Sequence, residues 1–262
     1  MNKNELLHAA EVAARRAGDI LRTGFGSVIT HTSKEGIHNL VTEYDLRCED
    51  TIISFLREAT PNASFLAEES GLSSSDNELT WIIDPLDGTV NFAHGIPIFC
   101  VSIAAAIGDV PICGVVHQPL LNETFTAISG EGATLNGISL HVSKTSQLKE
   151  SILVTGFPYN VNENPLNCID QFNKMISMGL PIRRLGSAAL DLAYIAAGRF
   201  DGYWEASLHA WDMAAGALLV QEAGGMVSHY GGREYRIGYD SIVATNGLIH
   251  NELVDTLLIV DA

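Results

Sequence analysis

Two aspartates follow a run of large apolar residues in the segment WIIDPLDGTVNF, residues 81–92. Asp84 comes directly after Trp-Ile-Ile, so we expect it at the end of a buried strand, and Asp87 follows three positions later. Carboxylates lose hydration when they are buried, and two of them close together need a counter-charge. The two aspartates therefore indicate that a cation supplies this charge, and the question is which one.

A polar turn is the plain alternative for this stretch. Pro85 fixes its own φ, Gly88 permits a tight turn, and aspartates bond local backbone N–H groups in turns. However, the segment after Gly88 can begin a short helix, and free N–H groups at a helix start bind anions. Carboxylates for a cation beside N–H groups for an anion are what a metal-dependent phosphate site requires.

Further acids are needed for a site with more than one metal ion. Glu68 and Glu69 follow a short apolar run in FLAEES, and Asp212 lies in the first turn of an expected helix. Each also has a plain explanation, because adjacent acids in a loop are often solvated and acids favour helix N-termini. Together with Asp84 and Asp87 they offer the oxygen ligands that Mg²⁺ prefers.

Other chemistries fit the sequence less well. It contains no GxxxxGK[ST] loop, no HExxH and no GxSxG, and the GFG and GEG stretches lack the third glycine of a dinucleotide site. The nine histidines are scattered without ligand spacing, and Ser187 has no evident base. A formal net charge of -16 argues against nucleic acid or an anionic membrane as partner.

The four cysteines show no CxxC spacing and are expected to be reduced thiols of a cytoplasmic protein. The N-terminus is expected to form an amphipathic helix and not a signal peptide, and no apolar run is long enough for a membrane span. Helices are predicted from the N-terminus to about Gly24 and at residues 46–56, 165–178, 187–198, 211–225 and 252–258. Strands are predicted at 28–32, 64–67, 81–84, 100–107, 112–116, 123–128, 134–141, 152–155, 201–205, 226–229 and 242–244, with a polar loop at 70–79. This mixture predicts one α+β or layered α/β unit.

Three blocks resemble the inositol monophosphatase family, a group of Mg²⁺-dependent, lithium-sensitive phosphatases. WIIDPLDGTVNF resembles its first signature, WDMAAGALLVQEAGG its second, and FLAEES its preceding acidic pair. The stretches NLVTEYD, ATLNG, TGFPY and RRLGSAALDLAYIAAGRFDGYWE extend the resemblance over nearly the whole chain, and the last is similar to bacterial members. The resemblance implies an α+β fold, a layered αβαβα sandwich as in inositol monophosphatase and fructose-1,6-bisphosphatase. We expect one domain, residues 1–262, with two layered halves that meet at roughly 140–150, and a homodimer.

The resemblance also implies roles for the acids, with two to three Mg²⁺ ions as cofactor. Glu68, Asp84 and the Leu86 carbonyl would hold the first ion, and Glu68 would also count among the catalytic residues. Asp84, Asp87 and Asp212 would hold the second ion. A third, weaker ion is expected near Glu68.

Catalytic and supporting residues follow in the same way. Asp45 and Thr89 resemble the pair that positions the attacking water and helps to remove its proton, and Glu69 supports them. Gly88 and Thr89 would offer backbone N–H groups to the phosphate. Lys34 matches a family lysine near the active-site loop.

The leaving-group side is expected to decide the substrate. Glu205 matches a glutamate that binds an inositol hydroxyl, and Gly186, Ser187 and Ala188 match a loop that contacts the ring. Residues expected at the substrate are thus Asp87, Gly88, Thr89, Gly186, Ser187, Ala188, Glu205 and Asp212. Arg183 or Arg184 would serve either a dimer contact or a second phosphate.

Three functions stay open on the sequence. The first is hydrolysis of inositol 1-phosphate and related polyol or sugar phosphates by direct attack of an activated water. The second is the same chemistry on fructose 1,6-bisphosphate, histidinol phosphate or 3′-phosphoadenosine 5′-phosphate. The third is a binding protein that keeps the fold without turnover.

Overall fold

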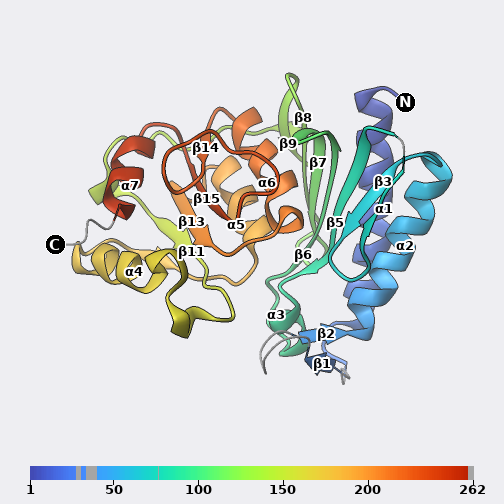
Figure 1. Ribbon diagram of the computed structural model, residues 1–262, viewed down its shortest axis with the longest axis horizontal. Helices are drawn as coiled ribbons and strands as arrows, with labels where there is room; N and C mark the ends of the chain where they lie inside the picture. Colours follow the sequence, from blue (N-terminus) through green and yellow to red (C-terminus); the bar gives the residue numbers. More distant parts are fainter. Residues whose placement is uncertain (28–30, 34–39, 76, 259–262) are drawn as a thin grey trace.

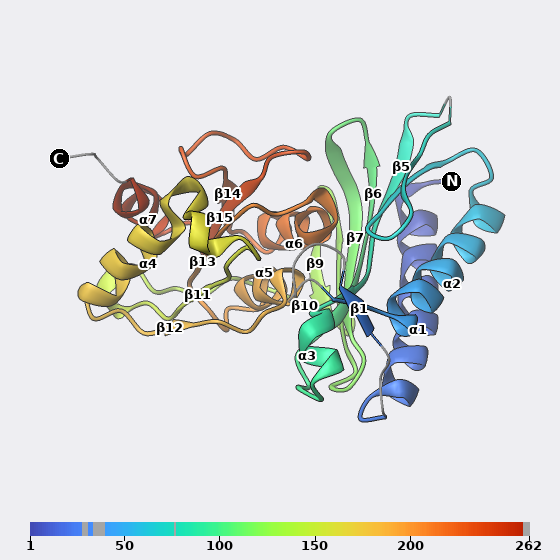
Figure 2. The same cartoon turned by 60° about the horizontal axis from the view of Figure 1, so that its bottom comes forward.

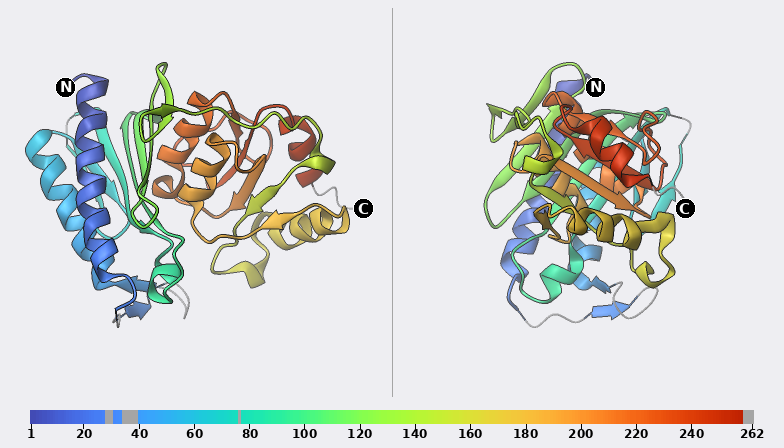
Figure 3. Two further views of the ribbon diagram at one scale, coloured as in Figure 1. Left: turned by 180° about the vertical axis from the view of Figure 1, so that it is seen from behind. Right: turned by 90° about the vertical axis from the view of Figure 1, so that its left-hand side faces the viewer.

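A computed structural model describes residues 1–27, 31–33, 40–75 and 77–258 of the chain. Helices and sheets alternate across it as a helix layer, a sheet, a second helix layer, a second sheet and a last helix layer (Figures 1 and 3). The layered αβαβα prediction is therefore confirmed. The two sheets do not share a strand, so residues that the layers bring together come from distant parts of the sequence.

The first sheet has eight strands in the order β10-β9-β8-β7-β6-β5-β3-β4. Its strands are β3 (Ser64–Ala67), β4 (Gly71–Ser73), β5 (Leu79–Asp87), β6 (Cys100–Ile107), β7 (Val110–Gln118), β8 (Glu123–Ile128), β9 (Gly132–Leu135) and β10 (Ile138–Ser139). Helices α1 (Lys3–Gly24) and α2 (Glu43–Ala59) cover one face. The α1 stripe of Leu6, Ala10, Ala13, Ala14 and Ala17 is buried, and its small side chains let the helix lie close to β6 and β7.

The second sheet has five strands in the order β12-β11-β13-β15-β14. Its strands are β11 (Leu153–Thr155), β12 (Ile182–Arg183), β13 (Gly202–Ala206), β14 (Met226–Ser228) and β15 (Ser241–Thr245). Helices α5 (Ala188–Ala196) and α6 (Ala210–Glu222) lie between the two sheets, and α4 (Cys168–Ser177) and α7 (His250–Leu257) lie outside the second (Figure 1). Residues 213–220 of α6 are all buried, because this helix is covered by a sheet on each side.

Several predicted boundaries are wrong for local reasons. Helix α2 begins at Glu43 instead of 46, because the Thr42 side chain caps it together with Asp45. The polar loop at 70–79 contains β4, which pairs with β3 through backbone bonds that its side chains do not reveal. The expected strand 134–141 is divided into β9 and β10 by a turn at Asn136 and Gly137, both with positive φ.

The remaining elements are short. Strands β1 (His31–Ser33) and β2 (Leu40–Thr42) pair with each other, and α3 (Thr89–Ala93) follows β5. Single 3₁₀ turns lie at Leu148–Glu150, Val161–Glu163 and Pro165–Asn167, so the helix expected from 165 begins as α4 at Cys168. Residues 28–30 of the strand expected at 28–32 lie outside the described residues. Among the helices within the described ranges, none is both long and apolar enough to span a membrane.

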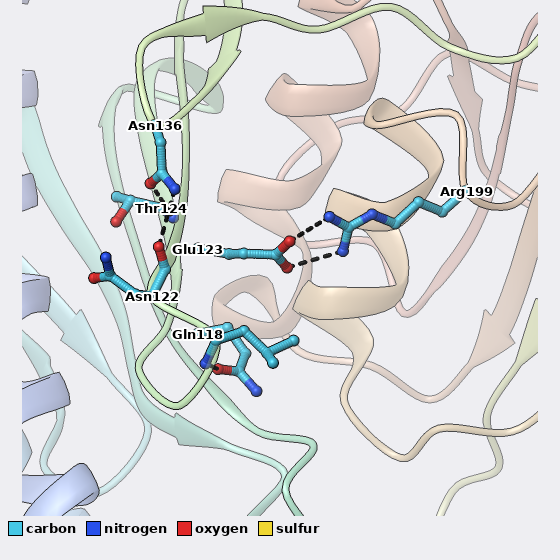
Figure 4. A network of polar contacts seen from close by, with 7 residues as sticks. Gln118, Asn122, Glu123, Thr124, Asn136 and Arg199 are labelled. Carbon is cyan, nitrogen blue, oxygen red and sulfur yellow. Dashed lines mark hydrogen bonds and ion pairs between the residues drawn. The ribbon is translucent and has the colours of Figure 1, made fainter.

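A polar network joins the first sheet to the α5–α6 layer away from the expected site (Figure 4). Arg199, in the loop after α5, forms a two-pronged ion pair with Glu123 at the start of β8. The neighbours of Glu123 are held by the Asn136 side chain. Its oxygen accepts from the Thr124 N–H at 3.0 Å, and its nitrogen donates to the Asn122 carbonyl at 3.0 Å. These bonds help to hold the first sheet in a fixed position against the α5–α6 layer.

Candidate active site

The end of β5 places the first group of carboxylates. Strands β3 and β5 run parallel with Ala67 opposite Ile83, and the Glu68 N–H donates to the Ile83 carbonyl at 3.1 Å. Glu68 therefore lies beside Asp84, because parallel strands end at the same edge of a sheet. A register irregularity lies between Asp84 and Asp87, so these two residues pair with Ser102 and Cys100 on β6. In a regular strand, side chains alternate between the two faces of the sheet. An irregularity of this kind at a strand end interrupts the alternation and changes the direction in which the carboxylates point.

Gly88 makes the turn from β5 into α3. Its φ is +96°, and a Cβ at this position would lie 2.9 Å from the Ile98 carbonyl oxygen, so only glycine fits. The turn brings the Thr89 hydroxyl to 2.9 Å from the Leu86 carbonyl oxygen. The sequence thus folds DPLDGT into a compact loop that exposes carboxylates and a carbonyl on one side.

Asp45 and Thr89 meet, as the resemblance implies. The Thr89 hydroxyl lies 2.8 Å from Asp45 Oδ1, and Asp45 is fully buried. The other oxygen, Oδ2, accepts from the Thr42 N–H at 2.7 Å and from the Thr42 hydroxyl at 2.5 Å. The Asp45 carboxylate is therefore held at the start of α2, with one oxygen facing Thr89. Figure 2 shows α3 beside β1 on the same side of the molecule.

The second half of the chain reaches Asp87 through the start of α5. The Ser187 hydroxyl donates to Asp87 Oδ2 at 2.6 Å, and the Ala189 N–H donates to the same oxygen at 2.7 Å. Asn91 of α3 donates to the carbonyls of Leu185 at 2.9 Å and Ile98 at 2.7 Å. The 186–188 loop is thereby tied to the turn that follows β5.

Asp212 joins the site from the first turn of α6. Its Oδ2 accepts from the His209 N–H at 2.7 Å, so the carboxylate caps its own helix. Helix α6 packs against β5 and β6, and this contact carries Asp212 toward the end of β5. The charge of Asp212 is among the causes that raise the pKa of Asp84, after burial.

Burial and their mutual charges raise the pKa values of the clustered carboxyl groups. Burial raises the pKa of Asp84 well above its usual range, and the charges of Glu68, Asp87 and Asp212 add to this effect. Loss of hydration, followed by the charge of Asp87, likewise raises the pKa of Asp212. Burial raises the pKa of Asp87 to about 6, although hydrogen bonds from Ser187 and Ala189 oppose it. Such a cluster is costly when charged, and a divalent cation would relieve that cost.

The donor set fits Mg²⁺. It consists of carboxylate oxygens and the Leu86 carbonyl, which are hard ligands. The Cys100 thiol lies 3.8 Å from Asp87 Oδ2, but burial keeps its pKa well above its usual range, so it stays a neutral thiol. Within the described residues, no group of three or more His, Cys, Asp or Glu side chains is arranged so that it could hold a metal ion. Instead, a carboxylate oxygen accepts a hydrogen bond from a backbone N–H group in each of Asp84, Asp87 and Asp212.

Glu205 lies on the second-half side of the site, on β13. It is buried, and its Oε2 accepts from the Tyr203 hydroxyl at 2.6 Å. Burial raises the pKa of Glu205 to about 7, against the opposing hydrogen bond from Tyr203. Its charge acts on Asp212, so Glu205 lies near the metal-ligand candidates.

Comparison with known proteins shows the family to which the chain belongs. A sequence profile of the inositol monophosphatase family matches residues 2–260. The chain belongs to the inositol monophosphatase family. It is 44% identical over 252 residues to the inositol-1-monophosphatase of Synechocystis sp., covering 96% of this chain and 88% of that protein. It is 42% identical over 258 residues to the Nus factor SuhB of Pseudomonas aeruginosa, covering 96% and 95%.

Solved structures agree with the family assignment. The inositol monophosphatase from Anabaena superposes with a TM-score of 0.86 at 41% identity, over 98% of this chain and 96% of that one. The extragenic suppressor protein suhB from Bartonella henselae superposes with a TM-score of 0.91 at 38% identity, over 96% and 98%. The protein is accordingly an enzyme of the phosphatase class, in a family that is generally metal-dependent.

Other expected residues are placed as follows. The Glu69 N–H donates to Glu49 Oε2 at 2.8 Å, which fixes the loop behind Glu68. Arg183 is exposed and donates to the Ile182 carbonyl, whereas the charge of Arg184 acts on Glu205. Lys34 lies outside the described residues.

Sequence reasoning missed several residues that shape the site. Thr42 and Asn91 position Asp45 and the 186–188 loop, and the NLVTEYD stretch already contained Thr42 as a helix-cap signal. Asp191 of α5 is buried, and neither of its oxygens has a hydrogen-bond partner among the described residues. Burial and the charges of Glu205 and Asp87 raise its pKa well above its usual range. Gly156, in TGFPY, contacts Glu205 so closely that no side chain fits there.

Proposed function

We propose that this protein hydrolyses inositol 1-phosphate and related polyol or sugar phosphates in an Mg²⁺-dependent reaction, by direct attack of water on phosphorus. The observation that carries the proposal is that the fold brings three sets of side chains to one region. These are the Asp84–Asp87 carboxylates, the Asp45–Thr89 pair and the Glu205 carboxylate on the opposite half. The name of the Synechocystis relative and the structure of the Anabaena inositol monophosphatase support the same reaction.

Mg²⁺ would be held by the residues that the resemblance assigned. Glu68, Asp84 and the Leu86 carbonyl would hold one ion, and Asp84, Asp87 and Asp212 a second, with a weaker third near Glu68. When bound, the ions neutralise the phosphate dianion, lower the pKa of water and stabilise the leaving alkoxide.

Asp45 and Thr89 provide the route for the proton of the attacking water. The Thr89 Oγ1 lies 2.8 Å from Asp45 Oδ1 and 2.9 Å from the Leu86 carbonyl oxygen, and its single hydrogen can be donated to either acceptor. In the proposed reaction the hydrogen is donated to Asp45, and the lone pairs of the hydroxyl accept from the water. An alcohol is a poor base on its own, so Thr89 passes its hydrogen to Asp45 as it accepts one. Burial raises the pKa of Asp45, even against the hydrogen bonds from Thr42 and Thr89, and this makes it a better proton acceptor.

The phosphate and the alcohol would be bound by opposite halves of the chain. Backbone N–H groups of Gly88 and Thr89 would face the phosphate, and the Gly186, Ser187 and Ala188 loop would contact the ring. Glu205 would accept a hydrogen bond from a ring hydroxyl. Asp87 and Asp212, which face this space, would also touch the substrate.

The remaining parts of the proposal concern the whole protein. The enzyme would act as a cytoplasmic homodimer, and Li⁺ would inhibit it. The four cysteines are buried free thiols, which supports a reducing compartment. The two layered halves would meet at roughly residues 140–150.

The test is phosphate release with and without Mg²⁺ on four esters: inositol 1-phosphate, fructose 1,6-bisphosphate, histidinol phosphate and 3′-phosphoadenosine 5′-phosphate. We expect the highest kcat/KM on inositol 1-phosphate and no turnover in EDTA. Highest turnover on another ester would keep the metal chemistry and move the substrate assignment to that ester. No turnover on any ester would contradict the proposal and favour a binding protein.

A further inference from the structure

Helix α5 begins at Ser187 without the cap that this serine could supply. A serine at the N-cap ordinarily accepts a hydrogen bond from the backbone N–H two or three residues later. The Ser187 side chain forms no such bond, although its backbone is extended as N-caps usually are, with φ −150° and ψ 101°. The Ala189 N–H, two residues later, instead donates to Asp87 Oδ2 at 2.7 Å. A carboxylate at the end of β5 therefore caps a helix that lies about a hundred residues later in the chain.

The Ser187 hydroxyl takes part in this arrangement as a donor. It donates to Asp87 Oδ2 at 2.6 Å. Cys100 pairs with Asp87 across β5 and β6, and its thiol lies 3.8 Å from the same oxygen and 3.7 Å from Ser187 Oγ. These three donors come from α5 and β6, and all of them lie at Oδ2. The Asp87 carboxylate is therefore held through one oxygen, and Oδ1 takes none of the three bonds.

The protein encloses Ser187. Only 2% of its surface is accessible, whereas Gly186 in front of it is half-buried. The loop is held from below by Asn91, which donates to the carbonyls of Leu185 at 2.9 Å and Gly186 at 3.3 Å. In Figure 2 helix α5 lies above α3, the helix that carries Asn91. This placement favours a role of the Ser187 side chain through Asp87 over a direct contact with the ring of a substrate.

We propose that Ser187 is a positioning residue, whose hydroxyl orients the Asp87 carboxylate for Mg²⁺ instead of contacting the substrate. The inference rests on the proposed function, because it takes Asp87 as a ligand of the second ion. With Oδ2 held by α5, Oδ1 is the oxygen that a cation would take. A donor at Oδ2 also draws charge away from the carboxylate, which alone would weaken its bond to a cation. The direction of the change on removing the hydroxyl therefore shows whether orientation or charge dominates.

The experiment compares wild type, Ser187→Ala and Ser187→Thr by isothermal titration calorimetry with Mg²⁺ and no substrate. Removing an outer partner of a metal ligand typically costs about tenfold to a hundredfold in metal affinity. We expect the Kd for Mg²⁺ to rise about tenfold in Ser187→Ala, because Asp87 keeps the bond from the Ala189 N–H. Ser187→Thr keeps the hydroxyl and should stay within about threefold of wild type.

Kinetics on two esters separates positioning from contact with the ring. The esters are inositol 1-phosphate and p-nitrophenyl phosphate, whose leaving group carries no further hydroxyl. At one Mg²⁺ concentration below saturation, kcat/KM of Ser187→Ala should fall on both esters by the same factor, within about twofold. A fall on inositol 1-phosphate alone, with an unchanged Kd for Mg²⁺, would show a contact with the ring and overturn the inference.

Ser151→Ala is the matched control. Ser151 is also buried, and its hydroxyl donates to the Gln147 carbonyl at 3.0 Å, at the 3₁₀ turn before β11. Thermal unfolding in EDTA should show that both alanine variants fold, and Ser151→Ala should keep the wild-type Kd for Mg²⁺. An unchanged or lower Kd in Ser187→Ala would overturn the inference, as would an equal rise in Ser151→Ala or in Ser187→Thr.

Failure of the proposed function would look different. Wild type that binds Mg²⁺ and prefers another phosphate ester would contradict only the substrate assignment, and the same comparison would then use that ester. Wild type that neither binds Mg²⁺ nor hydrolyses either ester would overturn both the proposed function and this inference.

Discussion

At the scale of single residues, Asp84 shows the conflict between stability and metal binding. It is buried among three further carboxylates, and its raised pKa means that its charge opposes folding without metal. We expect Asp84→Asn to reduce Mg²⁺-dependent turnover at least about a thousandfold, because both proposed ion sites lose a ligand. The metal-free variant should unfold at the same temperature as wild type or higher.

Phosphate release and thermal unfolding in EDTA measure both effects. Asp50→Asn, an exposed acid on α2, is the control and should change neither quantity. Activity close to that of wild type in Asp84→Asn would refute the metal assignment. A strongly lowered unfolding temperature would show that Asp84 stabilises the metal-free fold, against the argument from its pKa.

Gly156 gives a second prediction at this scale. Gly156→Ala should displace the Glu205 carboxylate, because the new methyl group would occupy its place. We expect a loss of discrimination among alcohols and a rise in KM for inositol 1-phosphate, measured by steady-state kinetics. Gly231→Ala is the control, because a Cβ there would meet only the His229 ring, at 3.9 Å. Equal kinetics in the two variants would contradict the positioning role of Gly156.

At the scale of elements, the start of α2 connects helix stability with catalysis. The Thr42 hydroxyl accepts from the Tyr44 N–H at 3.1 Å and donates to Asp45. Thr42→Val keeps the shape of the side chain and removes the cap, so the free energy of unfolding should fall by about 1 kcal/mol. The kcat should fall as well, because Asp45 loses a bond that orients it toward Thr89.

Urea unfolding and phosphate release test this prediction. Thr51→Val lies on the same helix, where the Thr51 hydroxyl donates to the Arg47 carbonyl one turn earlier. This control should change stability less and leave kcat as it is. If the two variants lose equal stability and equal activity, the cap has no special part in placing Asp45.

At the scale of the whole molecule, the buried acids make metal-free stability depend on pH. The pKa of Glu205 is about 7 in the folded state and near 4.5 when unfolded, so the folded state binds more protons between these values. The contribution of Glu205 is therefore most favourable below about pH 4.5 and is lost as the pH rises toward 7. Wild type should lose stability relative to Glu205→Gln by at most about 1.4 kcal/mol per pH unit in this range.

Chemical unfolding of both proteins in EDTA between pH 5 and 8 measures the difference. Comparison with the Gln variant cancels the acids on which the charge of Glu205 does not act. Asp191 and Asp212, whose pKa values that charge raises, remain part of the measured difference. The difference should level off above pH 7, where Glu205 is ionised in both states. A constant difference, or one of opposite sign, would show that the Glu205 carboxyl is not destabilised by burial.

The sequence by itself determined the phosphatase family and the class of fold. WIIDPLDGT and FLAEES marked carboxylates at strand ends, because apolar runs followed by acids report burial locally. The segments 64–67, 100–107 and 123–128 match β3, β6 and β8, since strand periodicity is a local signal. Local patterns did not reveal β4, because its three residues, Gly-Leu-Ser, show no strand periodicity and join the sheet through pairing with β3.

The tertiary structure alone decided which of these residues meet. Thr89 and Asp45 are 44 residues apart, and Ser187 and Asp87 are 100 apart, yet each pair is hydrogen-bonded. The resemblance implied that such groups share a site, but not that Asp87 is held by the start of α5. The sequence assigned Gly156 no role of its own, whereas the parallel pairing of β11 with β13 sets it beside Glu205. Spacing along a chain fixes only local geometry, whereas distances between elements depend on how the layers pack.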